Sequence, residues 1–223
     1  MRAKALGVVL FSSLLLASCR AAAWRDYLRT EPVEHYFYYP PARGVAGPPP
    51  LFVALLGDRL GPLDCIDLFY QFAEDRQFAL VCPRLGGREG LADVAQAERD
   101  LAGVLGNLYA EYVFQEQFYL TGFAEGADFA LAYALRYPAA VSGVSAMSIG
   151  TYPQSFVPPG PLPVQLIVGE EDEQGLAAAR DVEQVWNALG ILVRVVEIEG
   201  DGRSPSQAFA RFASGLIDQI ELR

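Results

Sequence analysis

The sequence predicts one α/β domain with a doubly wound, mostly parallel sheet that is covered by helices on both faces. Strand and helix patterns alternate from about residue 33 to the end of the chain, which is typical of this class. The run Leu51–Leu56 is continuously apolar, as expected for a strand that is buried on both faces. Apolar residues make up 52% of the chain, and this share favours a globular domain over a disordered one.

The elements follow in order from local patterns. Residues 40–50 form a Pro/Gly loop, residues 151–163 hold five prolines and are also expected to be a loop, and residues 91–112 show apolar and acidic residues at helical spacing. No internal repeat or linker divides the domain. Strands are expected at residues 35–39, 51–56, 78–82, 117–121, 141–147, 164–168 and 191–198, and helices at 64–76, 91–112, 125–137, 174–189 and 204–222.

The N-terminus has the pattern of an export signal. Arg2 and Lys4 precede a short apolar run, Leu6–Leu16, that is too short to cross a bilayer. The sequence Leu-Ala-Ser-Cys that ends at Cys19 resembles the bacterial lipoprotein signal, which implies cleavage before this cysteine and acylation of its thiol. We therefore expect a signal peptide over residues 1–18, a lipidated cysteine and tether over 19–32, and a folded domain over 33–223. An ordinary signal peptide with an incidental cysteine is the alternative.

This signal implies a protein that is exported to the cell envelope and held on a membrane through Cys19. The formal net charge is −10, and it becomes more negative when the signal peptide with its two cations is removed. Such a field repels phosphate backbones, so nucleic acid is excluded as a partner. The other two cysteines, Cys65 and Cys82, either form a disulfide, which export permits, or remain buried thiols. His35 is the single histidine, expected to be structural on an edge strand; no metal site and no cofactor are expected.

Residues 121–126, Thr-Gly-Phe-Ala-Glu-Gly, lie between a predicted strand and a predicted helix. This is the setting of the nucleophile elbow Gly-x-Ser-x-Gly, in which glycines allow the helix to approach the strand closely. Ala124 stands where the serine is required, and alanine has no nucleophilic atom. Asp172 follows a later strand, and Arg203 lies in the Gly-Asp-Gly-Arg segment before the last helix. Arginine stays protonated and cannot act as a general base.

Together these segments resemble the α/β-hydrolases, and most of all the compact esterases that include polyhydroxybutyrate depolymerases and feruloyl esterases. The resemblance extends from about His35 to Leu222. It implies an α/β-hydrolase fold without a large lid, in which Ala124, Asp172 and Arg203 occupy the positions of the serine, the acid and the histidine. Another doubly wound sheet, with the glycines serving only close packing, is the alternative.

The surroundings of these positions also depart from the family. Leu56 replaces the histidine that esterases of this kind usually carry before the oxyanion loop, and Asp58 and Glu125 fall near the two N–H groups that would hold an oxyanion. Glu125 is equally explained as an acid that stabilises a helix N-terminus. Arg203 is expected to pair with Asp172, or else to be a solvated cation. If the elbow persists, Ala124 should have a positive φ, which is unfavourable for a residue with a Cβ.

Three functions follow from this pattern. The first is a catalytically inactive lipoprotein that binds a small polar ligand or a protein partner at the mouth of the former pocket. The second is an enzyme that uses carboxylate chemistry in the same cleft, and the third is a structural envelope lipoprotein. The expected binding residues are Asp58, Arg59, Leu60, Glu125, Tyr152 and Phe156.

Overall fold

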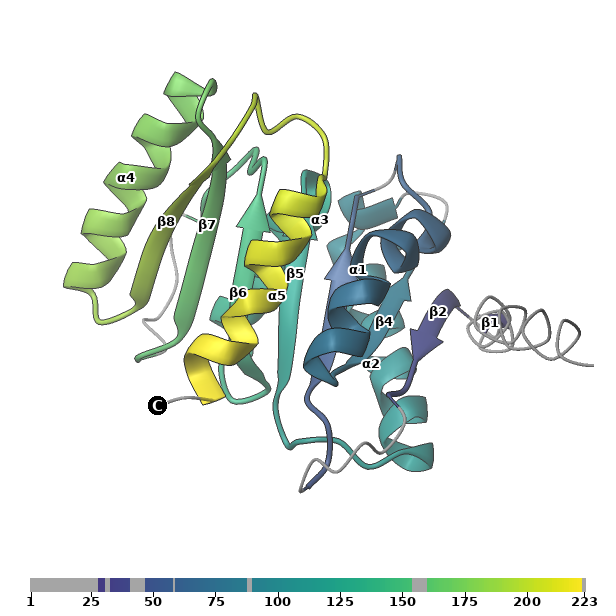
Figure 1. Ribbon diagram of the computed structural model, residues 1–223. Coiled ribbons are helices and arrows are strands. Elements are labelled where there is room, and N and C mark those ends of the chain that lie inside the picture. Colours follow the sequence, from purple (N-terminus) through teal and green to yellow (C-terminus); the bar gives the residue numbers. More distant parts are fainter. Residues whose placement is uncertain are drawn as a thin grey trace, which may run out of the picture.

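The computed structural model describes residues 28–30, 33–40, 47–57, 59–87, 90–153 and 160–221. Cys19, Asp58 and Phe156, for which the sequence predicts roles, lie outside the described residues. The described chain forms a sheet in the order β1-β2-β4-β3-β5-β6-β7-β8, with helices on both of its faces (Figure 1). The strands are β1 (Leu28–Thr30), β2 (Glu34–Tyr38), β3 (Leu51–Leu55), β4 (Ala79–Pro83), β5 (Phe118–Phe123), β6 (Val141–Met147), β7 (Pro163–Gly169) and β8 (Leu192–Ile198).

The sheet is mostly parallel, as the sequence predicts. Only β1 with β2 and β2 with β4 pair antiparallel, and all other neighbours run in the same direction. Every residue of the central strands β3, β4 and β5 is buried, because helices cover both faces of the sheet there. This double burial is the physical reason for the continuous apolar runs in the sequence.

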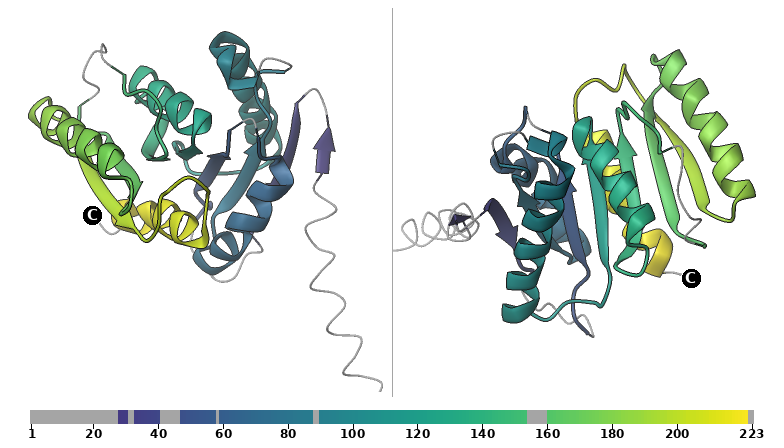
Figure 2. Two further views of the ribbon diagram at one scale, coloured as in Figure 1. Left: turned by 90° about the horizontal axis from the view of Figure 1, so that it is seen from above. Right: turned by 180° about the vertical axis from the view of Figure 1, so that it is seen from behind.

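Two helical layers enclose the sheet. The first holds α2 (Val94–Glu111), α3 (Glu125–Arg136) and α4 (Glu173–Ala188), and the second holds α1 (Pro62–Arg76) and α5 (Gln207–Glu221) (Figure 2). Each layer has its own hydrophobic core, with Leu101 and Leu131 in the first and Phe69 and Phe209 in the second. No described helix combines the length and the hydrophobicity that crossing a membrane would require.

Three differences from the predicted elements have local causes. Strand β1 lies inside the predicted tether and pairs with β2, so β2 is not an edge strand. His35 on β2 is buried, and its Nδ1 lies 2.8 Å from the Val33 carbonyl oxygen. Helix 91–112 is divided into a 3₁₀ turn, η2 (Gly90–Ala92), and α2, because Asp93 accepts a hydrogen bond from the Gln96 N–H and begins a new helix. The last helix starts late, at Gln207, where the hydroxyl of the preceding residue accepts from the Phe209 N–H.

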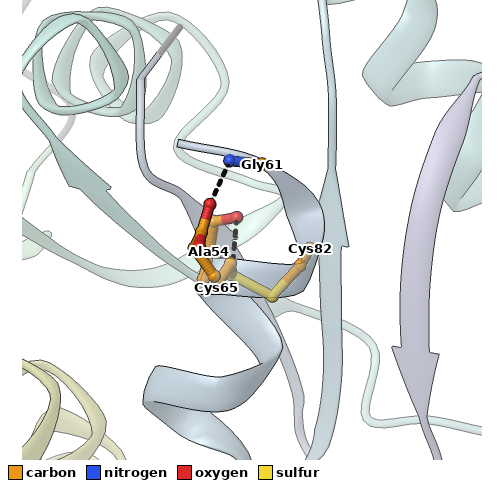
Figure 3. The surroundings of a disulfide bond; sticks show 5 residues. Ala54, Gly61, Cys65 and Cys82 are labelled. Carbon is orange, nitrogen blue, oxygen red and sulfur yellow. Dashed lines mark hydrogen bonds between the residues drawn. A yellow bond between two sulfur atoms is a disulfide. The ribbon is translucent and has the colours of Figure 1, made fainter. Parts of the chain in front are cut away.

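The two remaining cysteines form a disulfide. It joins Cys65 in the first turn of α1 to Cys82 near the carboxyl end of β4, with 5.9 Å between the Cα atoms, and Cys65 Sγ lies 3.5 Å from the Ala54 carbonyl oxygen (Figure 3). Both cysteines are buried. The bridge therefore links the second helical layer to the strand next to β3, close to the edge of the sheet where β3 ends.

We predict that Cys65→Ala/Cys82→Ala lowers the free energy of unfolding by about 3 kcal/mol, because the bridge closes a loop with a sequence separation of 17 residues. Urea unfolding with and without a reductant measures this. Reductant should lower the stability of the natural chain and leave the double variant unchanged. Equal stability of the two chains under oxidising conditions would contradict the prediction.

Candidate functional site

The candidate site lies at the edge of the sheet where β3, β5, β6, β7 and β8 end. Parallel strands that end at one edge bring the following loops together, and this is where open α/β sheets bind ligands. The Met147 carbonyl oxygen accepts a hydrogen bond from the Ala124 N–H at 3.0 Å. Gly202 packs closely against two of these strands. If it carried a Cβ, that atom would lie 3.5 Å from Met147 Cε and 2.9 Å from the Gly169 nitrogen. The loops after β5, β7 and β8, which carry the three predicted triad positions, therefore meet here.

A very tight turn connects β5 to α3, with only Ala124 between them. Ala124 has φ 51° and ψ −124°, so the positive φ predicted at this position is confirmed. The flanking glycines are required by contact: a Cβ on Gly122 would lie 2.1 Å from the Gly126 oxygen, and one on Gly126 would lie 2.1 Å from the Leu55 oxygen. No larger residue fits either position. The backbone therefore has the sharp strand-to-helix turn of a nucleophile elbow, and its central side chain is a methyl group.

The carboxylate of Glu125 lies beside the loop that follows β3. Gly57 in this loop has φ +78°, and a Cβ there would lie 2.8 Å from Glu125 Oε2 and 3.7 Å from the Glu125 backbone nitrogen. The acid thus sits near the N–H that would act as an oxyanion donor in an active hydrolase. It is favoured there by the dipole of α3, and it opposes the binding of an anion. Asp58, expected on the same loop, is outside the described residues.

The acid and base positions are close in the fold but do not pair. Asp172 is the N-cap of α4 and accepts a hydrogen bond from the Gly175 N–H at 2.9 Å. The Arg203 side chain is 85% exposed, and its Nε lies 3.8 Å from Asp201 Oδ2. The predicted Arg203–Asp172 ion pair is therefore wrong. Asp201 is only two residues from the arginine and also accepts its backbone N–H at 3.0 Å, whereas Asp172 is engaged at the start of a helix.

Asp128, one turn after Glu125 on α3, is a site residue that the sequence reasoning missed. Its carboxylate accepts hydrogen bonds from the N–H groups of Gly150 at 2.9 Å and Thr151 at 3.1 Å, which ties the loop after β6 to α3. Burial raises the pKa of Asp128 and the nearby charge of Glu125 raises it further, while the two N–H donors act in the opposite direction. The i, i+3 spacing of two acids after the elbow was the available signal.

Tyr152 lies in the same loop, within electrostatic range of the Asp172 and Asp128 carboxyl groups. Burial raises the pKa of the Tyr152 phenol to about 12, with smaller contributions from the charges of Asp172 and Asp128. Its ring packs edge-to-face against Trp186 of α4, with 6.5 Å between the ring centroids. The Tyr152 hydroxyl therefore remains protonated at neutral pH.

The expected binding residues that the structure describes do not share one hollow. Leu60 lines a cleft of about 220 Å³ beside the loop after β3, Glu125 lines one of about 410 Å³ beside α3, and Tyr152 lines one of about 320 Å³ that also contains Asp172. Arg59 lies on an exposed turn and lines none of the three, and Phe156 is outside the described residues. Within the described part of the chain, no group of three or more His, Cys, Asp and Glu side chains could hold a metal ion.

No family model matches the chain, and no curated protein matches it in sequence. Solved structures do match. Esterase PE8 superposes with a TM-score of 0.64 at 23% identity, over 84% of this chain and 99% of the esterase. A carboxylesterase from Bacillus cereus superposes with a TM-score of 0.65 at 15% identity, over 86% of this chain and 96% of the carboxylesterase. S-formylglutathione hydrolase from Staphylococcus aureus superposes with a TM-score of 0.66 at 10% identity, over 84% of this chain and 90% of the hydrolase.

The chain has an α/β-hydrolase fold. At these identities the likeness concerns the fold and not the activity. Within the hydrolase fold Ala124 occupies the turn after β5, Asp172 follows β7, and Arg203 follows β8. This is the chain order of nucleophile, acid and base in α/β-hydrolases.

We predict that Ala124→Gly raises the free energy of unfolding by about 1 kcal/mol. Relief of about 1–3 kcal/mol of backbone strain exceeds the roughly 0.4–1 kcal/mol that glycine loses through its freer unfolded chain. Urea unfolding measures the change. Ala102→Gly, at an exposed position inside α2, is the matched control and should lower stability by about 1 kcal/mol. Similar destabilisation by both variants would contradict the strained turn.

Proposed function

We propose that this protein is a catalytically inactive α/β-hydrolase-fold lipoprotein that binds a ligand or a protein partner at the cell envelope. The observation that carries the proposal is the methyl group of Ala124 on a backbone turn that keeps the conformation of a nucleophile elbow. The positive φ of this turn is energetically unfavourable for any residue with a Cβ. The turn is kept here although Ala124 lacks the hydroxyl group of a nucleophilic serine.

The neighbouring side chains support the loss of ester hydrolysis. The Arg203 guanidinium cannot accept a proton and points into solvent. Glu125 places a carboxylate beside Gly57, near the backbone N–H groups of this turn; two unit charges 4 Å apart repel by between about 1 and 4 kcal/mol, depending on exposure. An oxyanion donor supplies about 2.7–4 kcal/mol, so the carboxylate offsets much of what the remaining N–H groups could provide.

A second candidate function is catalysis by carboxyl groups in the same region. The observation that favours it is that burial raises the pKa of Asp128, because a carboxyl group with a raised pKa can act as a general acid. Its weakness is that Asp128 already accepts two backbone hydrogen bonds. Turnover of any ester, amide or glycoside that is lost in Asp128→Asn would establish this function in place of the first.

We predict that the natural chain hydrolyses p-nitrophenyl acetate at least about a hundredfold more slowly than the ~10 s⁻¹ typical of enzymes. Ala124→Ser should also be inactive because Arg203 cannot take its proton, and Ala124→Ser/Arg203→His is the minimum change for any recovery. Ala124→Gly is the control, since it removes nothing that could react. Ordinary esterase rates in the natural chain, unchanged in Ala124→Gly, would refute both the proposal and the site.

The envelope location in this proposal rests on Cys19 as the point of lipid attachment. From Cys19 to the start of β1 at Leu28 the chain can extend by at most about 30 Å, which keeps the domain near the membrane surface. The full sequence has a net charge of −10, and the chain without its signal peptide is more acidic still, so anionic lipids would repel it and acyl chains must supply the attraction.

We predict that the chain produced in a bacterial host is found in the membrane fraction and incorporates labelled palmitate. Cys19→Ser should abolish the label and release the protein from the membrane, because the acylated thiol is lost. Cys65→Ala/Cys82→Ala is the matched control: it removes the other cysteines and should retain the label. Labelling of Cys19→Ser would contradict the lipid anchor.

A further inference from the structure

A mainly apolar cleft of about 410 Å³ lies between the start of α2 and the side of α3. Its α3 wall is formed by residues at positions i, i+3, i+4, i+7 and i+8, namely Glu125, Asp128, Phe129, Ala132 and Tyr133. This spacing places them along one side of the helix. Leu91, Val94, Thr151 and Pro153 are also among its lining residues. The size is within the range of small-molecule sites.

The topology explains why this side of α3 has room for a ligand. Parallel strands are usually joined by a helix that crosses the sheet. Between β6 and β7, however, the described residues contain no helix, and the loop passes the cleft as Thr151–Pro153. The other side of α3 holds Ala127, Ala130 and Leu131, which are fully buried against the sheet. Phe129 is therefore left with an apolar hollow beside it.

The charged side chains that line the cleft, among the residues that the structure describes, are all acidic. Three carboxylates line it, and no basic side chain is among its described lining residues. Glu98 is already neutralised, because Arg136 forms an ion pair with it and the Tyr137 hydroxyl donates to it at 3.2 Å. Glu125 and Asp128 lie one turn apart at the other end, and no cationic side chain of the described residues pairs with either.

The geometry points to a binding site for a small organic cation with an apolar body, such as an aryl- or alkylammonium compound. The ammonium group lies by Glu125 and Asp128, and the hydrocarbon part lies between Phe129 and Leu91. This inference rests on the proposed function, because it assigns a ligand class to a face that we propose binds without turnover. It also accounts for the two acids next to the elbow, which oppose the anionic intermediates of ester hydrolysis.

The raised pKa of Asp128 agrees with this assignment. Burial and the charge of Glu125 disfavour its ionised form, the N–H donors of Gly150 and Thr151 favour it, and no cationic side chain of the described residues forms an ion pair with it. A ligand cation beside both carboxylates supplies the missing charge. Hydrogen bonds from Gly150 and Thr151 hold the Asp128 carboxylate in place, so it does not have to be ordered by the ligand.

Three probes with the same phenylbutyl skeleton test the charge requirement: 4-phenylbutylamine, 4-phenylbutanol and 4-phenylbutyrate. Calorimetric titration uses the full lipidated chain in nanodiscs of zwitterionic lipid, with empty nanodiscs as the blank. We expect the amine to bind about fivefold or more tightly than the alcohol, and the carboxylate to bind more weakly than both. The preference for the amine should decrease as the salt concentration rises.

Matched variants locate the site. Glu125→Gln and Asp128→Asn should each weaken amine binding about threefold, and together they should make the amine and the alcohol equal. Asp128→Asn retains an oxygen that can accept from the Gly150 and Thr151 N–H groups, so the loop stays attached. Asp67→Asn removes an equal charge from α1 on the other face of the sheet and should change nothing. Ala132→Phe should fill the cleft and abolish binding of both compounds, whereas Ala102→Phe on the exposed side of α2 should not.

Equal affinity of the natural chain for the amine and the alcohol, binding that persists in Ala132→Phe, or no binding of any probe at millimolar concentration would each overturn the assignment. Failure of the proposed function has a separate readout. Hydrolysis of 4-phenylbutyl acetate would refute the absence of catalysis and leave the amine preference intact. A chain that hydrolyses nothing and shows no preference for the amine refutes the ligand class alone.

Discussion

The close approach of α3 to the sheet is the constraint on which the rest of this site depends. One residue separates the end of β5 from the start of α3. The backbone segments approach each other so closely that only glycine fits at positions 122 and 126. The turn then forces Ala124 into a positive φ. As a result, α3 begins at this edge of the sheet with two acids in its first turns. Glu125 lies beside Gly57, and Asp128 contacts the loop after β6.

The charged side chains at this edge of the sheet are the second feature that defines the site. In an active hydrolase this edge stabilises a developing anion through N–H groups. Here Glu125 lies beside that position, Asp128 holds the loop after β6, and Arg203 is turned into solvent next to Asp201. These three side chains belong to separate segments of the fold. The backbone keeps the turn of a nucleophile elbow, and the charged side chains beside it are those of Glu125, Asp128 and Arg203.

The fold could be predicted from the sequence because its signals are local and repeated. The apolar run of β3, the glycines around Ala124 and the alternation of strands and helices each follow from physics that acts within a few residues. Pairing between distant or competing partners could not be predicted. Strand β1 exists only because β2 offers it hydrogen bonds, and the choice of Arg203 between Asp172 and Asp201 depends on which carboxylate is already engaged.

By itself the sequence determined the class of the fold, the place of the elbow, and the residues Ala124 and Arg203 at the positions that resemble those of the serine and the histidine. These depend on residue identity and on periodicity along the chain. Only the tertiary structure decided that Cys65 and Cys82 are bonded, that Asp128 anchors a loop, and that one side of α3 faces an apolar, acidic cleft. Each of these depends on how closely two segments that are distant in sequence approach each other. Bonds, burial and charge–charge interactions act across space and produce no periodic pattern along the sequence.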